Sequence, residues 1–153
     1  MGCLHYVNLL DIINHMKNLE ELKEIAEHSY PESRNKIGAI LICEDGKTYS
    51  GFTVRRSSVL GSTCAERMAL DNWFQDKDRT KPIKLILIGK IMRIGWNNTH
   101  ICYPCGVCRE LYHQFTHINN IKDFTFECYS WDSKHKDTKT IRELLYYGDP
   151  FYE

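Results

Sequence analysis

Three cysteines and one glutamate have the types and spacing of a metal-dependent catalytic site. Cys105 and Cys108 are separated by two residues in "PCGVCRELY", so at the first turn of a helix their thiolates would project from one face. Pairs of thiolates at this spacing form half of many tetrahedral zinc sites, although so short a motif also occurs by accident. The pair alone therefore leaves two interpretations open, a metal site and two small buried residues at a helix start.

Cys64 favours the metal interpretation. In "STCAERMAL" it follows Ser62 and Thr63, residue types that cap helices, and it stands at a second predicted helix start. Unpaired backbone N–H groups and the positive end of the helix dipole favour thiolate over thiol at such starts. Three thiolates leave zinc with one open position, which is typical of catalytic sites. Water in that position can reach a pKa of about 7 and supply hydroxide at neutral pH.

Glu66 would then be the general acid and base, taking a proton from water and delivering it to the substrate. Residues two apart on a regular helix point in nearly opposite directions. Glu66 and Cys64 can therefore share a site only if both side chains project past the tip of the helix. The alternative is that Glu66 is a first-turn carboxylate that stabilises the helix dipole.

Arg67 and Arg109 are candidates for balancing the negative charge of a zinc trithiolate. Arg67 is three residues after Cys64, and Arg109 is four residues after Cys105. Each arginine thus shares a helix face with a metal ligand, and we expect both to donate hydrogen bonds to the sulfurs. For Arg109 a solvated surface arginine is the alternative.

The elements that must position these residues follow an α/β order. Helices are expected from about Leu19, over Cys64–Phe74, from about Cys105 to Phe115 and over Thr138–Tyr147, with "DSKHKD" as a solvated loop. Strands are expected over Lys36–Cys43, Thr48–Val54, Lys84–Ile91 and Asp123–Ser130, the first two joined by an Asp45-Gly46 hairpin turn. This order predicts an α/β sandwich whose mixed sheet has an antiparallel first pair and then strands joined by helical crossovers.

The bulk composition excludes several classes of protein. The 153 residues fit one domain over positions 1–153, and 20 basic residues balance 20 acidic ones. That balance, with no aromatic-and-basic stripe, argues against nucleic acid and anionic membrane as partners. No apolar run approaches the ~18–20 residues that span a bilayer. Seven cysteines in a chain without an export signal, three of them clustered, predict a reducing cytoplasm rather than disulfides.

The motif "TCAER" followed by "PCGVCRE" resembles the zinc-dependent cytidine deaminase family, in its small cysteine-three type. The segment "KIGAILICEDGKTYSGFTV" is similar to the family's hairpin, and "IRELLYY" falls where the family has its last helix. The resemblance extends over most of the chain from about Leu19. It implies a three-layer α/β/α sandwich with a mixed five-stranded sheet, and a homotetramer whose neighbouring subunits help to close each pocket.

The resemblance also implies a reaction. Zinc, held by Cys64, Cys105 and Cys108, would activate a water that attacks C4 of a cytosine ring while Glu66 protonates N3. Glu66 would then pass a proton to the departing ammonia, leaving a uracil product. The expected substrate is a small cytosine nucleoside of pyrimidine metabolism, cytidine or deoxycytidine by default.

The sugar-binding half of the pattern departs from the family. In "TVRRSS", Thr53, Arg55 and Arg56 stand where the family has Asn, Glu and Asn, so cations that only donate replace a carboxylate that accepts. These three residues, with Ala65 of the "CAE" motif, are the candidate substrate contacts. Arg55 or Arg56 could bind a phosphate or carboxylate on a nucleotide or a blasticidin-like nucleoside. They could also be interface residues or simply solvated.

Two further positions depart from the family. Asn35 takes the place of an aromatic residue expected before the first strand, and Phe151, in a divergent tail, is a candidate aromatic lid. A non-catalytic class also stays open, because Cys102 could close a structural zinc site or join an iron–sulfur cluster. Neither of those needs Glu66. A deaminase-like scaffold without activity is the third alternative, against which the complete set of cysteines and glutamate argues.

Overall fold

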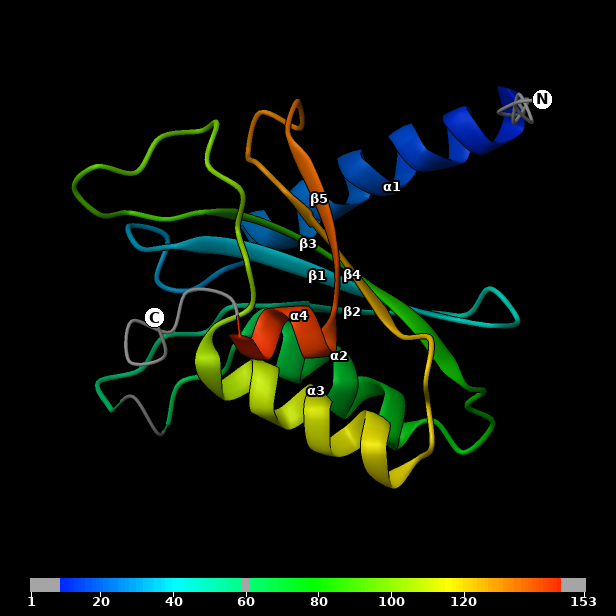
Figure 1. The fold of residues 1–153 in the computed structure, drawn as a ribbon. Coiled ribbons are helices and arrows are strands. Elements are labelled where there is room, and N and C mark those ends of the chain that lie inside the picture. The colour runs from blue at the N-terminus through cyan, green and yellow to red at the C-terminus, as the bar shows by residue number, and fades with distance from the viewer. Residues whose placement is uncertain (1–8, 59–60, 147–153) are drawn as a thin grey trace.

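A computed structural model describes residues 9–58 and 61–146 of the chain (Figure 1). Its elements are α1 (Leu9–Glu27), β1 (Lys36–Cys43), β2 (Thr48–Phe52), α2 (Ala65–Gln75), β3 (Pro82–Lys90), α3 (Gly106–Ile118), β4 (Thr125–Tyr129), β5 (Lys136–Thr140) and α4 (Ile141–Tyr146). The four strands expected from the sequence are present within a few residues of their predicted bounds. Helix α1 begins at Leu9, earlier than the apolar spacing from Leu19 indicates.

The sheet has the strand order β2-β1-β3-β4-β5. Strand β1 is antiparallel to both of its neighbours, β3 and β4 are parallel, and β5 is antiparallel to β4. Helix α1 lies on one face of the sheet, whereas α2, α3 and α4 cover the other (Figure 1). The prediction of a mixed five-stranded sheet between two helical layers is therefore confirmed.

The core is divided between the two faces by the alternation of side chains along the strands. Ala39 and Leu41 of β1 point into a large cluster that includes residues of α2, α3 and α4. Ile40, between them, points the other way and packs with Leu22 and Ala26 of α1. The larger cluster lies beneath the helices that begin at the cysteines, so the deeper half of the core supports the candidate site.

The C-terminal end of the sheet differs from the prediction. The expected solvated loop over 132–137 is wrong in its last two residues and the expected helix from Thr138 is wrong in its first three, since Lys136–Thr140 is strand β5 and α4 begins only at Ile141. Strand β5 lies at the edge and carries polar side chains, so it lacks the apolar alternation by which strands are recognised. A capping box marks the true helix start: the Thr140 N–H donates to Glu143 Oε2 (2.7 Å), and the Glu143 N–H donates to Thr140 Oγ1 (3.3 Å).

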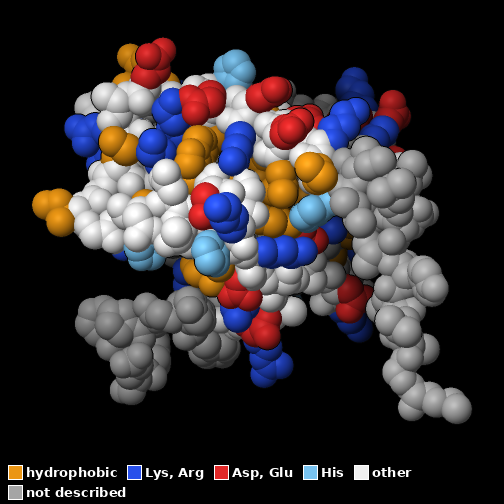
Figure 2. All heavy atoms as spheres, turned by 90° about the horizontal axis from the view of Figure 1, so that it is seen from above, with side chains coloured by type: hydrophobic (Ala, Val, Ile, Leu, Met, Phe, Trp, Pro, Cys, Tyr) orange, Lys and Arg blue, Asp and Glu red, His pale blue; other side chains and the backbone are white. Residues whose placement is uncertain are grey.

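The surface on the α1 side shows positive and negative side chains mixed together rather than a patch of one charge. Figure 2 shows Lys and Arg side chains interspersed with Asp and Glu on this face, with apolar atoms between them. This mixture agrees with the balanced composition of the whole chain. Within the described ranges, no helix is both long and apolar enough to cross a membrane.

Helix α2 packs directly on the backbone of strand β2 at Gly51. A Cβ atom at Gly51 would lie 2.1 Å from the Ala65 carbonyl oxygen and 2.6 Å from the Ala69 nitrogen. Only a residue without a side chain permits this approach. The contact sets the height of the N-terminal end of α2 above the sheet, which is the end that carries Cys64 and Glu66.

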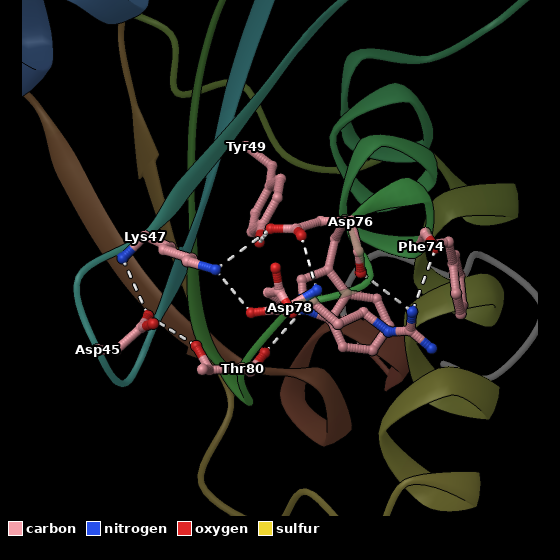
Figure 3. Close-up of polar contacts among 9 residues, drawn as sticks. Asp45, Lys47, Tyr49, Phe74, Asp76, Asp78 and Thr80 are labelled. Atoms are coloured by element: carbon pink, nitrogen blue, oxygen red, sulfur yellow. Dashed lines mark hydrogen bonds and ion pairs between the residues drawn. The ribbon is translucent and has the colours of Figure 1, made fainter.

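The opposite end of α2 is fastened to the β1–β2 hairpin by polar contacts (Figure 3). The Tyr49 hydroxyl donates to Asp76 Oδ2 at 2.6 Å, and Lys47 Nζ donates to the Asp78 carbonyl oxygen at 2.6 Å. Both acceptors lie immediately after the helix, while both donors come from the hairpin. The helix is thus held at one end by close packing and at the other by hydrogen bonds.

Candidate active site

The three candidate ligands stand at the starts of two helices, as the sequence predicted. Cys64 is the N-cap of α2 and Cys105 the N-cap of α3, each with extended backbone (φ −76°, ψ 151° and φ −67°, ψ 164°). Cys108 lies in the first turn of α3. The helices are brought together on one face of the sheet, so that cysteines 41 residues apart in sequence become neighbours.

The spacing of the sulfurs fits a zinc ion. The Sγ atoms of Cys64, Cys105 and Cys108 all lie within 4.8 Å of one another, and those of Cys64 and Cys105 are 3.6 Å apart. Tetrahedral zinc with Zn–S bonds of ~2.3 Å requires sulfurs about 3.8 Å apart. The donor set is also right, because thiolates at helix starts are soft, anionic ligands. Cys102 does not belong to this group among the described residues.

The pKa values of the three thiols are shifted in opposite directions. Hydrogen bonds from the thiols of Cys108 and Cys64 lower the pKa of Cys105 far below its usual range. Hydrogen bonds of Cys108 with Cys105 and with Cys64 raise the pKa of Cys108, and the bond to Cys105 is the largest cause that raises the pKa of Cys64. A divalent cation bound among the three sulfurs would favour their thiolate forms.

The carboxyl group of Glu66 reaches the cysteine cluster. Glu66 is only 4% exposed, and burial raises its pKa to about 7. Hydrogen bonds from its own backbone N–H, from the Cys108 thiol and from the Cys105 backbone N–H oppose that rise. The geometric difficulty noted from the sequence is resolved because Cys64 precedes the helix with extended backbone, so Cys64 and Glu66 do not follow helical spacing.

Arg67 and Arg109 hold the turns that carry the ligands. Arg67 Nη2 donates to the Ser62 carbonyl oxygen at 2.5 Å, and Arg109 Nε donates to the Pro104 carbonyl oxygen at 2.8 Å. Each guanidinium thus reaches back five residues to the segment that leads into a cysteine ligand. Arg109 Nη1 also donates to the Leu144 carbonyl oxygen of α4 at 2.9 Å. Direct donation to the sulfurs stays a prediction.

Tyr112 is a positioning residue that the sequence reasoning missed. Its side chain is fully buried, and its hydroxyl donates to the Glu66 carbonyl oxygen at 2.8 Å. This bond ties the first turn of α2 to α3 and so links the glutamate to the helix of Cys105 and Cys108. Its place four residues after Cys108, on the same helix face, was the available signal.

A cavity of about 530 Å³ opens beside the cysteines. It is lined by Arg34, Asn35, Ile37, Thr53, Arg55, Arg56, Ser57, Ser62, Thr63, Cys64, Glu66, Ile91, Cys102, Tyr103 and Cys105. Volume and lining suit a small organic ligand with a few fixed polar contacts.

The cavity collects most of the predicted substrate contacts. Thr53, Arg55 and Arg56 line it, whereas Ala65 is fully buried in the core between Cys64 and Glu66. The roles assigned to these residues stay predictions. Arg34, from the turn before β1, joins the lining and was not anticipated, because nothing in the local sequence links that turn to the segment after β2.

The remaining candidates have clear positions. Cys102 lines the cavity as a buried residue, and burial raises the pKa of its thiol well above the usual value. Asn35 also lines the cavity, and its Oδ1 accepts a hydrogen bond from the Met92 N–H (2.9 Å). Phe151, the candidate lid, lies outside the described residues. All six cysteines in the described ranges are free thiols.

Comparisons with known proteins agree with this site. The family model for the cytidine and deoxycytidylate deaminase zinc-binding region matches residues 13–125, a span that includes all three cysteines and Glu66. The chain is 30% identical to a cytidine deaminase of Sporosarcina psychrophila over 100 residues, which cover 65% of this chain and 68% of the relative.

Solved structures of cytidine deaminases share the fold. The enzyme from Burkholderia pseudomallei superposes with a TM-score of 0.65 at 24% identity, over 85% of this chain and 94% of that one. The enzyme from Mycobacterium leprae gives 0.60 at 18% identity, over 83% and 92% of the two chains. The enzyme from Bacillus anthracis gives 0.57 at 19% identity, over 88% and 89%.

Proposed function

Because this chain belongs to the cytidine and deoxycytidylate deaminase family, we propose that it hydrolyses the 4-amino group of a cytosine nucleoside to give a uracil product and ammonia. One observation carries the proposal: three sulfurs with zinc-like spacing and a buried glutamate line or adjoin the same cavity. A structural zinc site would not need a carboxyl group at that place.

We assign the metal site to Cys64, Cys105 and Cys108, whose donor type and separation fit zinc. Zinc bound there would lower the pKa of a water molecule towards 7 and so supply a nucleophile at neutral pH. The chain contributes the geometry. Two helix starts fix the ligands, and their backbone N–H groups and dipoles favour the thiolate forms.

Glu66 carries the protons in this proposal. Its carboxylate accepts a proton from the attacking water and delivers it to N3 of the ring as the water oxygen bonds to C4. A second proton, from the same oxygen now bonded to C4, then passes through Glu66 to the amino nitrogen, the C4–N bond breaks, and ammonia leaves. Burial of Glu66 keeps bulk water from exchanging these protons, and the Tyr112 hydroxyl fixes the backbone from which Glu66 projects.

The test is an ultraviolet assay of the purified, zinc-loaded protein with cytidine and deoxycytidine, in which conversion to the uracil product changes the absorbance. Ammonia is measured in parallel and should appear in equal amount. Turnover of neither these nucleosides nor their charged derivatives, by folded protein with zinc bound, would contradict the proposal.

The proposal extends to the assembly and the compartment. The resemblance to cytidine deaminases supports a homotetramer, which sedimentation or light scattering would measure. The free thiols of the described cysteines suit a reducing compartment such as the cytoplasm.

A further inference from the structure

Three exposed arginines line the cavity, and we call them the arginine rim: Arg34, Arg55 and Arg56. Arg34 comes from the turn between α1 and β1, while Arg55 and Arg56 follow β2. All three are exposed to solvent and all three line the cavity that also contains Cys64, Glu66 and Cys105. Among the described residues that line this cavity, Glu66 is the acidic one.

Backbone hydrogen bonds hold the segments of the rim together. The Arg55 N–H donates to the Tyr30 carbonyl oxygen at 2.7 Å, and the Tyr30 N–H donates to the Thr53 carbonyl oxygen at 2.9 Å. Arg34 belongs to the turn after Tyr30, where its N–H donates to the Pro31 carbonyl oxygen at 3.0 Å. The two arginines therefore stand on one bonded framework rather than on independent loops.

Arg56 is oriented by a third segment. Its Nη1 donates to the Gly61 carbonyl oxygen at 2.7 Å and to Thr63 Oγ1 at 3.3 Å. Thr63 is in turn paired with Val54 by two backbone hydrogen bonds of 2.9 and 2.8 Å. These bonds fix the Nη1 side of the guanidinium in the wall of the cavity.

The positive charge of the rim is not neutralised within the described structure. The ion pairs in the described ranges use Lys36, Lys47, Lys84, Lys136 and Lys139, and none includes an arginine of the rim. The three guanidinium groups line one cavity, and an anion bound between them would offset their positive charge. Their planar arrays of N–H donors match the oxygens of phosphate and carboxylate.

Thr53 belongs to the cavity wall, but its hydroxyl oxygen is closed off from the cavity. Its Oγ1 is buried and has no hydrogen-bond partner among the described residues. Thr53 lies two residues before Arg55 in the same cavity wall.

We propose that the arginine rim binds an anionic group, phosphate or carboxylate, that the substrate carries at the end remote from the cytosine ring. This inference rests on the proposed deaminase function, because it assumes that the ring lies against Cys64, Cys105 and Glu66. It adds that the preferred substrate is a charged cytosine nucleoside rather than cytidine itself. A cavity of about 530 Å³ has room for a nucleoside with such a group.

The test compares three compounds that share the cytosine ring: cytidine, cytidine 5′-monophosphate and cytidine 5′-carboxylate. We expect the wild-type protein to turn over at least one charged compound with a kcat/KM about tenfold or more above that of cytidine. The better of the two charged compounds identifies phosphate or carboxylate as the group. The preference should shrink as salt is raised from low to high concentration.

Variants then assign the preference to the rim. Arg34→Gln and Arg55→Gln should each raise KM for the preferred charged compound about tenfold and raise KM for cytidine by a clearly smaller factor. Arg142→Gln, which removes an exposed arginine of α4, is the matched control and should change neither. Equal kcat/KM for all three compounds, or equal effects of the rim variants on cytidine and on the charged compounds, would overturn the inference.

A binding measurement separates this inference from the proposed function. Calorimetry with the Glu66→Gln protein measures the affinity for each compound without turnover. The inference about the rim is upheld if a charged compound binds preferentially and if adding Arg55→Gln to this protein removes that preference. This holds even if the wild-type protein deaminates nothing. Absence of any preference among the three compounds overturns the inference that the rim binds an anionic group, even if the wild-type protein deaminates cytidine.

Discussion

The two ends of the cavity are built in different ways. The inner end consists of Cys64, Cys105 and Glu66, which stand at the starts of α2 and α3 and are supported by the core beneath them. The outer end is the arginine rim, whose side chains are exposed and stand on turns joined by a few backbone hydrogen bonds.

This difference suggests a division of labour. Groups that do chemistry must be held within a fraction of an ångström, which helix starts packed on a sheet can achieve. Groups that select a substrate can reside on loops, where substitution disturbs little else. We therefore expect changes at the inner end to affect every cytosine compound alike, and changes at the rim to affect charged compounds most.

Loss of a metal ligand should have the largest effect. Cys108→Ser is expected to abolish zinc retention and turnover of all substrates, because a neutral hydroxyl is a poor substitute for thiolate. Cys102→Ser is the matched control, since Cys102 is a buried thiol of the same cavity outside the sulfur group. Metal analysis should find about one zinc per chain in the control. Loss of zinc from Cys102→Ser would indicate a closed structural site instead.

Loss of the proton carrier should come next. Glu66→Gln is expected to keep zinc and the fold while lowering kcat about 10²–10⁴-fold, because an amide cannot relay a proton. The factor should be the same for charged and uncharged compounds. Glu110→Gln, a change of an exposed carboxylate on α3, is the control. Turnover near that of the wild type in Glu66→Gln would refute the assigned role.

The tie between the two helices should give the smallest effect. Tyr112→Phe removes the hydrogen bond to the Glu66 carbonyl oxygen and leaves the aromatic ring in place. We expect a loss of about 1 kcal/mol in the free energy of unfolding, measured by denaturant titration. A fall of a few-fold in kcat, equal for all substrates, should accompany it. A fall confined to charged substrates would contradict the division between the inner end and the rim.

The same division explains what the sequence could predict. Cys64, Glu66, Cys105 and Cys108 lie in two short motifs with fixed spacing, so their types and positions carry the chemistry locally. The strands of the sheet interior were also predictable, because burial on one or both faces leaves an apolar pattern.

The features that could not be predicted from the sequence are set by contacts between distant segments. Arg34 joins Arg55 only through the hydrogen bonds around Tyr30. Strand β5 is defined by its backbone pairing with β4, from Thr125 and Thr140 to Tyr129 and Lys136, and its polar side chains give no sign of it. Neither feature has a local signature.

The contact between Gly51 and α2 makes a residue without any functional group decisive for activity. A methyl group at this position would collide with the Ala65 carbonyl oxygen and force the helix outward. We expect Gly51→Ala to cost about 1–3 kcal/mol of stability and to displace Cys64 and Glu66 together, with zinc content and turnover falling in step. Gly61→Ala, where the atom nearest to the added Cβ would lie 3.6 Å away, should leave stability, zinc content and turnover unchanged. A random screen for inactive variants would thus return Gly51 beside the true catalytic positions, and only a stability measurement would tell the two kinds of hit apart.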